Sequence, residues 1–432
     1  MSAAVARSLP PVPKPSGKVR WIVCALLFFA VVISYIDRLV LGILKPDLSR
    51  TYGWTEGGYA DLQIWFQAAY GIGFLISGRL IDRVGARIGY VIAIIVWTAG
   101  HVAHALFTTT QGMVLARVPL ALGESATYPA ALAATSEWFP QRERALAIGI
   151  LNAGANIGAT VTPLIVPVLA LSFGWQAAFI ATGALSIVWL AAWLAIYRRP
   201  REHRTVSAQE LAWIESDPAA VVTQVPFRTL LALRQTWAYM AGRFLIDPVW
   251  WTFLFWLPSF FDQQFGAKMM QFGPPLIAIY LLADLGSIAG GYTSSKLLGH
   301  GWSANRSRKF AMALCAVSAV PVAFAAQAPT IWTAALLIGI ACAAHQGFST
   351  NLFALPGDLF PKGTQGSVVG LGGLAGATGS MLMAKFAGVI LETVKSYQPI
   401  FIAAGGAYLL ALLVVHLLVP RWTPVDSARL VR

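Results

Sequence analysis

The sequence predicts an all-α membrane protein whose twelve transmembrane helices form two six-helix halves. Three observations support this prediction. Hydrophobic residues make up 57% of the 432 residues, charged residues make up 11%, and the mean hydropathy is +0.66, which is too apolar for a soluble protein of ordinary composition. Apolar runs of about 20 residues, the length that crosses a bilayer, recur along the chain. Finally, motifs of the first half return in the second half.

The apolar runs predict six helices in each half. In the first half they cover approximately residues 20–44, 58–80, 88–108, 111–134, 144–168 and 174–196. In the second half they cover approximately residues 237–262, 272–298, 309–328, 330–355, 366–392 and 397–420. The first run follows a basic segment, as in a secretory signal, but it continues into Asp37 and Arg38 without a cleavage site of small residues. We therefore interpret it as an uncleaved first helix.

The most polar stretch of the chain, from Arg198 to about Arg234, separates the two halves. Within it, Ser207 precedes the amphipathic segment AQELAWIE, which predicts a short helix with a serine cap. We expect five parts: a cytoplasmic N-terminal segment (1–19), an N-terminal six-helix bundle (20–197), a cytoplasmic linker (198–236), a C-terminal six-helix bundle (237–420) and a cytoplasmic tail (421–432).

An internal repeat supports the division into two halves. The segment EWFPQRERALAIG at 137–149 returns in reduced form as DLFPKGTQGSVVG at 358–370, and WQAAFIATGA at 175–184 returns as YQPIFIAAGG at 397–406. Both pairs have nearly the same offset, as a duplicated unit requires. Two parallel six-helix halves are the organisation of a rocking transporter whose site lies at their interface.

Lysine and arginine predict the orientation. They gather in the N-terminal segment, the linker, the C-terminal segment and the loops after the second, fourth, eighth and tenth predicted helices. The loops on the opposite side hold only Lys45, Arg50, Lys268 and Lys395. By the positive-inside rule, both termini and the linker are cytoplasmic. The net charge of +13 then reflects membrane topology, and we expect no nucleic-acid partner.

Two predicted helices of the first half each contain a pair of charged residues. Arg117 and Glu124 lie seven residues apart, roughly 10 Å along one helix face, and Tyr128 extends that face. An ionisable side chain at the bilayer centre costs roughly 3 kcal/mol, so this pair indicates a water-filled cavity or mutual pairing. A structural ion pair that fixes helix packing is the alternative to a functional site, and we favour the functional site. Asp37 and Arg38 form the second charged pair.

Other polar residues in the predicted helices have a functional and a structural interpretation. Tyr35 shares a face with Arg38, and that charged pair could also anchor a helix end at the membrane interface. Gln63, Gln67 and Tyr70 recur on one face, where glutamines serve helix–helix hydrogen bonds as well as ligand contact.

The second half also contains polar residues within predicted helices. We interpret Arg243 and Asp247, four residues apart, as a structural pair. Asp284 is equally consistent with helix packing and with lining a cavity. We interpret His345 as a packing residue rather than as a proton carrier. The stretch QGFSTN, from Gln346 to Asn351, is dense in hydrogen-bonding groups and predicts a wall that reads substrate hydroxyls.

The stretch GRLIDRVGARIG at 78–89 resembles the signature of the major facilitator superfamily. In that family the aspartate and arginines latch the cytoplasmic face, and the glycines permit a tight turn. The resemblance implies a latch of Gly78, Asp82, Arg83, Gly85 and Arg87. The corresponding stretch at 290–309 keeps glycines and basic residues but has Ser294 and Ser295 where the acid would stand.

Four segments resemble the anion:cation symporter family, and most of all its hexuronate carriers. They are SYIDRLVLGIL (34–44), ALGESATYPAAL (121–132), EWFPQRERALAIGILNAGANIGA (137–159) and HQGFSTNLFALPGDLFPKGTQGSVVGLGG (345–373). The resemblance implies that Tyr35 and Arg38 hold the substrate carboxylate and that Asp37 takes a proton. Arginine suits this task because its planar fork matches a carboxylate. Tyr70 matches a substrate tyrosine of the family, and Asn156 matches a position that binds sugar hydroxyls.

From these features we expect a proton-coupled symporter that imports a sugar acid, either a hexuronate such as glucuronate or galacturonate or a related aldonate, by alternating access. An anion that enters a negative cell moves against about 2.3 kcal/mol per 100 mV, so accumulation needs a cation such as the proton. The expected substrate-binding residues are Tyr35, Arg38, Gln67, Tyr70, Arg117, Asn156, Gln346, Ser349 and Asn351. The expected proton-coupling residues are Asp37 and Glu124, each beside an arginine. We expect a monomer in the lipid bilayer of a bacterial inner membrane.

The sequence leaves alternative functions to consider. Trp65, Phe66 and Phe348 would suit an aromatic acid, so proton-coupled uptake of an aromatic or dicarboxylic acid competes with sugar-acid uptake. A proton-driven efflux antiporter typically has a Gly-Pro pair in the fifth helix, whereas four residues separate Gly158 from Pro163 here. The three cysteines are far apart, and the sequence shows neither metal-ligand spacing nor a nucleophile elbow. We therefore expect no metal, no cofactor and no enzyme.

Overall fold

The computed structural model describes residues 17–216, 225–361 and 364–425, and regular structure in these residues is helical throughout. The first half contains α1 (Val19–Tyr52), α2 (Glu56–Ala103), η1 (His104–Leu106), α3 (Thr110–Glu124), α4 (Thr127–Trp138), α5 (Gln141–Phe173) and α6 (Trp175–Ile196). Then come η2 (Pro200–Glu202), α7 (Ala208–Ile214) and α8 (Phe227–Leu231). The second half contains α9 (Arg234–Phe265), α10 (Gly273–Gly299), α11 (Ala304–Ala319), η3 (Val320–Gln327), α12 (Ile331–Leu359), α13 (Gln365–Thr393) and α14 (Gln398–Leu418).

The described helices account for twelve membrane crossings. Ten helical spans are long and apolar enough to cross a membrane. One of these contains α2, whose 48 residues would measure roughly 72 Å, more than twice the ~30 Å of a bilayer core. Because Gly85 interrupts its helical geometry with φ 79° and ψ 164°, α2 makes two crossings. α3 and α4 together make one more. The predicted all-α membrane fold is thus confirmed.

The helix predicted at 111–134 is present as one crossing, but a turn at Ser125 and Ala126 divides it into α3, which ends at Glu124, and α4, which begins at Thr127. Pro129 accounts for the break, since it has no N–H to donate to the carbonyl of Ser125 four residues earlier. The hydroxyl of Ser77 on α2 lies 3.5 Å from that carbonyl instead. Glu124 therefore stands at the end of a helix inside the bundle.

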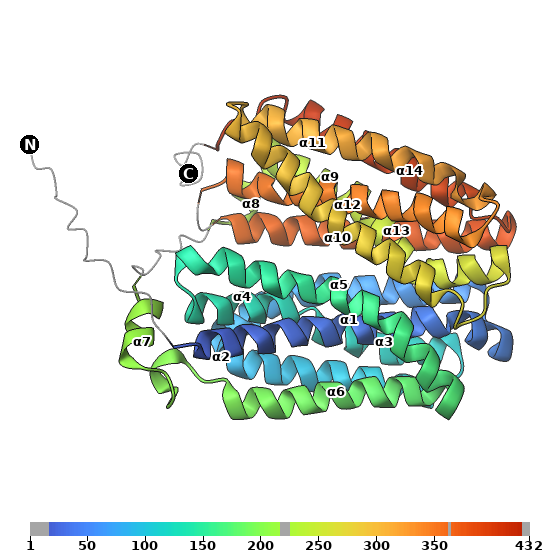
Figure 1. Cartoon of the computed structure of the whole chain (residues 1–432), viewed down its shortest axis with the longest axis horizontal. Helices are drawn as coiled ribbons and strands as arrows, with labels where there is room; N and C mark the ends of the chain where they lie inside the picture. The colour runs from blue at the N-terminus through green and yellow to red at the C-terminus, as the bar shows by residue number, and fades with distance from the viewer. Residues whose placement is uncertain (1–16, 217–224, 362–363, 426–432) are drawn as a thin grey trace, which may run out of the picture.

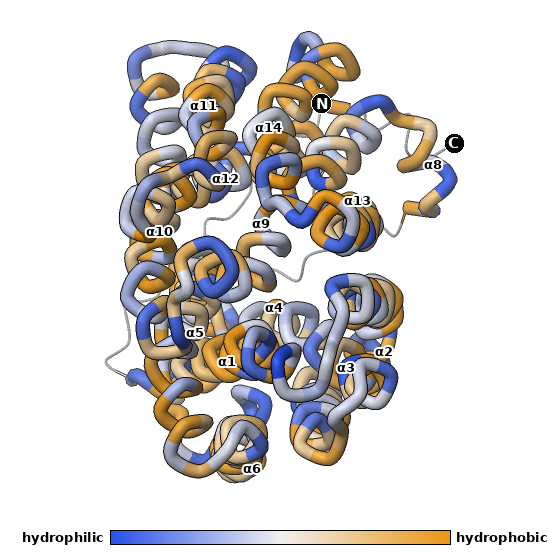
Figure 2. Tube along the Cα trace, turned by 90° about the vertical axis from the view of Figure 1, so that its right-hand side faces the viewer, coloured by the Kyte–Doolittle hydropathy of each residue, from blue (hydrophilic) through white to orange (hydrophobic). Residues whose placement is uncertain are grey.

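The helices pack as two groups, which the end-on view separates most clearly (Figure 1, Figure 2). In the first group α2 packs on α3 and α1 packs on α5; in the second, α10 packs on α12 and α9 packs on α13. The groups meet where α2 contacts α13, α5 contacts α10 and α1 contacts α9. Outward side chains such as Ile187 and Val188 of α6 are apolar and exposed, as a lipid-facing surface requires. The exact boundaries expected for the two bundles stay predictions.

Glycines bring α2 and α3 into backbone contact. A Cβ atom on Gly100 of α2 would lie 2.4 Å from the backbone nitrogen of Leu120, and one on Gly123 of α3 would lie 2.5 Å from that of Trp97. Small residues at such crossings are the usual way to bring membrane helices close. The second half uses the same device, since a Cβ on Gly290 of α10 would lie 2.4 Å from Gly347 of α12.

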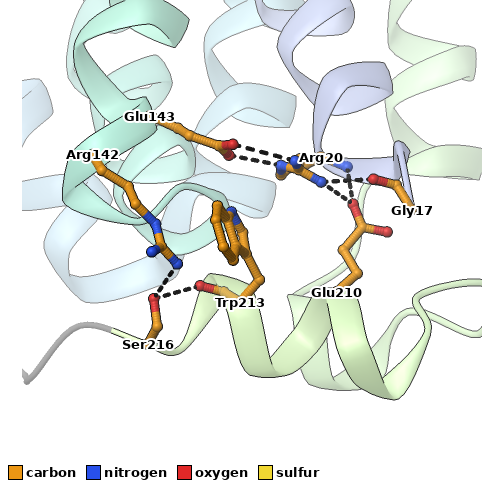
Figure 3. Close-up of polar contacts among 7 residues, drawn as sticks. All are labelled: Gly17, Arg20, Arg142, Glu143, Glu210, Trp213 and Ser216. Atoms are coloured by element: carbon orange, nitrogen blue, oxygen red, sulfur yellow. Dashed lines mark hydrogen bonds and ion pairs between the residues drawn. The ribbon is translucent and has the colours of Figure 1, made fainter. Parts of the chain in front are cut away.

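The linker helix α7 is attached to the ends of α1 and α5 (Figure 3). Ser207 caps it by accepting a hydrogen bond from the backbone of Glu210, which confirms the serine cap predicted for this helix. Arg20 of α1, which is buried, forms ion pairs with Glu143 of α5 at 2.8 Å and with Glu210 of α7 at 3.0 Å. Arg142 lies over the ring of Trp213, with its Cζ 3.3 Å from the ring centroid.

Arg20→Ala is expected to destabilise the protein by about 3–5 kcal/mol, because Glu210 would stay buried without its cation. The measurement is the thermal unfolding midpoint of the purified protein in detergent, read from tryptophan fluorescence. Arg201→Ala is the matched control, because it breaks an ion pair with Glu215 in the same linker that is exposed to solvent. Equal shifts for the two variants would show that the buried ion pairs do not hold α7 in place.

Candidate substrate site

The site is built around Arg38, which is buried in the middle of α1. Its Nε and Nη2 atoms both lie 2.8 Å from Oε2 of Glu124 at the end of α3. Aromatic rings surround the guanidinium: its Cζ lies 4.8 Å from the ring centroid of Tyr35, 5.0 Å from that of Tyr70 and 5.0 Å from that of Trp251. These rings stabilise the cation through their π faces. Because Trp251 belongs to α9, both halves of the protein contribute to this site.

Arg117 lies beside Arg38 but is paired differently. Its Nη2 donates to the backbone carbonyl of Arg38 at 3.1 Å, and its Cζ lies 4.5 Å from the ring centroid of Phe66. Its Nε and Nη1 atoms are buried without a hydrogen-bond partner among the described residues. The arginine that pairs with Glu124 is therefore Arg38 of another helix, and the two side chains of α3 do not form an ion pair with each other.

Buried polar atoms without partners gather around these charges. Besides the two nitrogens of Arg117, they include Oε1 of Glu124, Nε2 of Gln67 and both amide atoms of Gln63, as far as the described residues show. Gln63 and Gln67 share a face of α2 with Phe66 and Tyr70, which contact the arginines. A buried polar group left unpaired costs roughly 1–3 kcal/mol, so this region suits a polar ligand.

The charges favour an anionic ligand. With Arg38, Arg117 and Glu124 all ionised, the site carries one net positive charge inside the bilayer. A carboxylate would neutralise that charge and accept charge-assisted hydrogen bonds from the guanidinium groups. The arrangement offers no nucleophile beside a base, and no group of three or more potential metal ligands occurs in the described part of the chain.

Asp37 points away from this site, so the expectation that it lies beside an arginine is wrong. Its Oδ2 accepts hydrogen bonds from Trp97 Nε1 at 2.8 Å and from the hydroxyl of Ser186 at 3.1 Å. Its Oδ1 lies 3.2 Å from Nε2 of His101. Consecutive helix residues point about 100° apart, so Asp37 and Arg38 serve different neighbours. Its role in proton coupling stays a prediction.

His101 is the residue that the sequence analysis missed. It is fully buried and belongs to the second crossing of α2. His101 stands within an apolar run, about one turn before His104, and an ionisable residue in such a run indicates a candidate functional site, as the charged pairs do.

The predicted residues of the second half are not all brought to Arg38. Asn351 is buried and donates to the carbonyls of Gly290 and Gly347 at 3.1 and 2.9 Å, which ties α12 to α10. Ser349 is buried on α12 and Gln346 is half-buried there; in the first half, Asn156 is half-buried on α5. Their contacts with substrate stay predictions.

Two further polar groups of the second half have partners within that half. Arg243 pairs with Asp247 at 2.6 Å and lies 4.5 Å from the ring centroid of Phe353, which fits the predicted structural pair. The ring of His345 stacks on Trp250 at 5.2 Å between centroids, and its Nδ1 lies 3.1 Å from the hydroxyl of Tyr408. Both arrangements agree with the structural interpretations that the sequence favoured.

The latch residues lie on both sides of the break in α2. Gly85 has a positive φ, which favours glycine, and this agrees with the tight turn that the resemblance implies. Arg87 donates to the carbonyl of Leu194 at 3.1 Å within the first half. Asp82 and Arg83 are exposed and form no hydrogen bond or ion pair with the described residues. Their role as a latch stays a prediction, as does that of Gly78.

Comparisons with known proteins identify the family. A model of the Major Facilitator Superfamily matches residues 27–384. The chain is 30% identical to the hexuronate transporter of Escherichia coli K12 over 415 residues, or 94% of each chain, and 32% identical to the galacturonate transporter of Dickeya chrysanthemi over 278 residues, or 63% of this chain and 81% of the relative.

A solved structure shares the fold. It is an inward-facing, occupied bacterial homolog of the human lysosomal transporter Spinster, and it matches with a TM-score of 0.74 at 16% identity, over 95% of this chain and 100% of that chain. The family match, the similarity to hexuronate carriers and the helical fold confirm the resemblance seen in the sequence. The chain therefore belongs to the major facilitator superfamily, and it is a multi-pass membrane transporter rather than an enzyme.

Proposed function

We propose that this transporter is a proton-coupled symporter that imports a sugar acid, such as glucuronate, galacturonate or a related aldonate, by alternating access. The observation that carries the proposal is the buried ion pair of Arg38 and Glu124, with Arg117 adding a second cation. The names of the hexuronate, galacturonate and L-galactonate relatives support a sugar acid as the substrate.

The ion pair explains how a proton and an anion are coupled. In the structure, Glu124 occupies two nitrogens of the Arg38 fork, the group best suited to bind a carboxylate. A proton on Glu124 removes its charge and releases the fork to the substrate. Without that proton, two carboxylates would compete for one guanidinium in a medium where charge repulsion is strong. Release of the proton inside the cell restores the ion pair and expels the substrate.

The uncharged groups suit the rest of a sugar acid. The unpartnered amide of Gln63 and the unpartnered Nε2 of Gln67 can form hydrogen bonds with hydroxyls. The rings of Tyr35, Tyr70 and Trp251 can pack against the apolar face of a sugar ring while they flank the carboxylate. The same rings favour an aromatic acid as the second candidate, because they would also stack on its ring.

Contacts between the two halves support alternating access. At one end of the bundle, Arg50 of α1 pairs with Asp262 of α9 at 2.6 Å, Gln263 of α9 donates to Glu56 of α2 at 3.0 Å, and Glu392 of α13 accepts from the backbone of Gly57 at 2.7 Å. At the other end, Asp82 and Arg83 make no such contact with the described residues. With the termini cytoplasmic in a bacterial inner membrane, this is a carrier closed outside, acting as a monomer.

The substrate class is tested by a thermal-shift screen of the purified protein with glucuronate, galacturonate, benzoate and glucose. A ligand present at 100 times its Kd stabilises a protein that binds it only when folded by about 2.7 kcal/mol. We expect the two sugar acids to raise the unfolding midpoint and glucose to leave it unchanged. A shift with benzoate alone would favour the aromatic acid, and no shift with any carboxylate would contradict the anion site.

Arg38→Lys is expected to abolish uptake of radiolabelled glucuronate into proteoliposomes while the protein still folds, because lysine keeps the charge but loses the planar fork. Arg243→Lys is the matched control, since Arg243 is also a membrane-embedded arginine paired with a carboxylate. We expect this control to keep most of the uptake. Near-normal uptake by Arg38→Lys would mean that Arg38 serves only the packing of α1.

Glu124→Gln is expected to separate exchange from accumulation. The amide resembles the protonated acid, so substrate still binds and exchanges when it is present on both sides of the vesicle membrane. Accumulation driven by a pH gradient fails, because the amide has no proton to release. Both assays are run on one preparation of reconstituted protein. Retained pH-driven accumulation would remove Glu124 from the coupling mechanism, and equal loss of both activities with protein yield would indicate a structural role.

A further inference from the structure

A second buried polar cluster lies between α1, α2 and α6, on the side of α1 that faces away from Arg38. It consists of Asp37, Trp97, His101, Thr182 and Ser186, all nearly or completely excluded from solvent. Trp97 and Ser186 donate to one oxygen of Asp37, and the other oxygen lies 3.2 Å from Nε2 of His101. The same Nε2 lies 2.7 Å from the hydroxyl oxygen of Thr182.

The hydrogen bonds of Thr182 assign the tautomer of His101. Thr182 donates its hydroxyl hydrogen to the carbonyl of Ala178 at 2.9 Å, so its oxygen acts as an acceptor toward His101. Nε2 of His101 therefore carries a hydrogen, which it donates to Thr182. The other ring nitrogen, Nδ1, is buried and has no hydrogen-bond partner among the described residues. Nδ1 is thus the basic nitrogen of this ring.

Two donors favour the ionised form of Asp37. Trp97 and Ser186 donate to its Oδ2, while its Oδ1 lies 3.2 Å from Nε2 of His101 and accepts no hydrogen bond from the described residues. A buried carboxylate without a cation is unfavourable in a bilayer. A proton on Nδ1 of His101 would supply that cation, because the resulting imidazolium lies in contact with Asp37 and cancels its charge.

We propose that His101 carries a coupling proton on Nδ1, with Asp37 as its fixed counter-charge. This inference rests on the proposed proton-coupled symport and adds a residue to it. The proton enters from the outer water, forms an N–H bond at Nδ1 and leaves from the same nitrogen on the inner side, so no other bond is made or broken. Asp37 and Arg38 are consecutive on α1. The net charge of Asp37 and His101 therefore changes next to the residue that binds the substrate.

The other charged groups around His101 affect how readily it takes up a proton. His104, at the start of η1, and Arg117 of α3 oppose a positive charge on His101 when they are protonated. Glu124 of α3 acts on Asp37 as a like charge when it is ionised. From α6 the cluster receives the hydroxyls of Thr182 and Ser186. Protonation of Glu124 and of His101 are thereby linked through Asp37.

His101→Gln tests the proposal, because the glutamine amide can keep an N–H toward Thr182 and Asp37 but cannot take up a proton. Purified wild type and variant are reconstituted, and glucuronate counterflow and pH-gradient-driven accumulation are measured between about pH 5 and 8. We expect counterflow to survive and accumulation to be lost. A variant that accumulates glucuronate with the wild-type pH profile would overturn the proposal.

Two further variants complete the experiment. His104→Asn is the matched control, because its amide can still donate to the carbonyl of Gly100 as Nδ1 of His104 does, and we expect wild-type accumulation. Ser186→Ala keeps the test decisive if His101→Gln does not insert. It removes one donor to Asp37, so the carboxylate attracts a proton on His101 more strongly and the midpoint of the pH profile moves upward. An unchanged midpoint would overturn the proposal.

The wild-type protein separates this proposal from the proposed function. If the wild type does not accumulate glucuronate in response to a pH gradient, proton-coupled sugar-acid symport itself is wrong. If the wild type does so and the His101 variant behaves identically, only the role of His101 is wrong.

Discussion

The ion pair of Arg38 and Glu124 is the interaction on which the site depends. Neither charge is stable alone in a bilayer, so the side chains of Arg38 on α1 and Glu124 at the end of α3 stabilise each other by pairing. The close approach of α2 to α3 at Gly100 and Gly123 holds α3 at the required depth. α3 ends at Glu124 because Pro129 has no N–H to donate to the carbonyl of Ser125. The carboxylate therefore lies at the short turn between α3 and α4, where Ser125 and Ala126 keep right-handed helical backbone angles.

The first helix divides its two charges between two environments. Arg38 faces aromatic rings from both halves of the protein, so any motion of one half against the other changes its surroundings. Asp37 faces α2 and α6 within a single half, where rocking changes little. The two positions suit different tasks: Arg38 can bind substrate at the interface that moves, and Asp37 can balance the charge of a bound proton within one half. Placing them on consecutive residues joins the two through a single helix.

The parts outside the membrane core hold the halves without locking them. α7 is attached to the first half by the buried charges of Arg20 and Glu210, so this helix of the linker moves with that half. The ion pair between Arg50 and Asp262, which joins the two halves at the Arg50 end, is partly exposed, whereas Tyr59 is buried and donates to the backbone of α9 at 2.9 Å. Exposed ion pairs contribute little stability each, which suits contacts that must break in every cycle.

The sequence by itself determined the fold class, because hydropathy, the length of a bilayer crossing and the repeat of motifs are properties of the chain alone. It also determined which residue types line the site, since an arginine or glutamate inside an apolar run is informative without knowledge of its neighbours. Only the tertiary structure decided the partners. Helical periodicity places Arg117 and Glu124 on one face of one helix, but it does not say which helix faces them. For this reason Glu124 was found with Arg38 rather than Arg117, and Asp37 with His101 rather than an arginine.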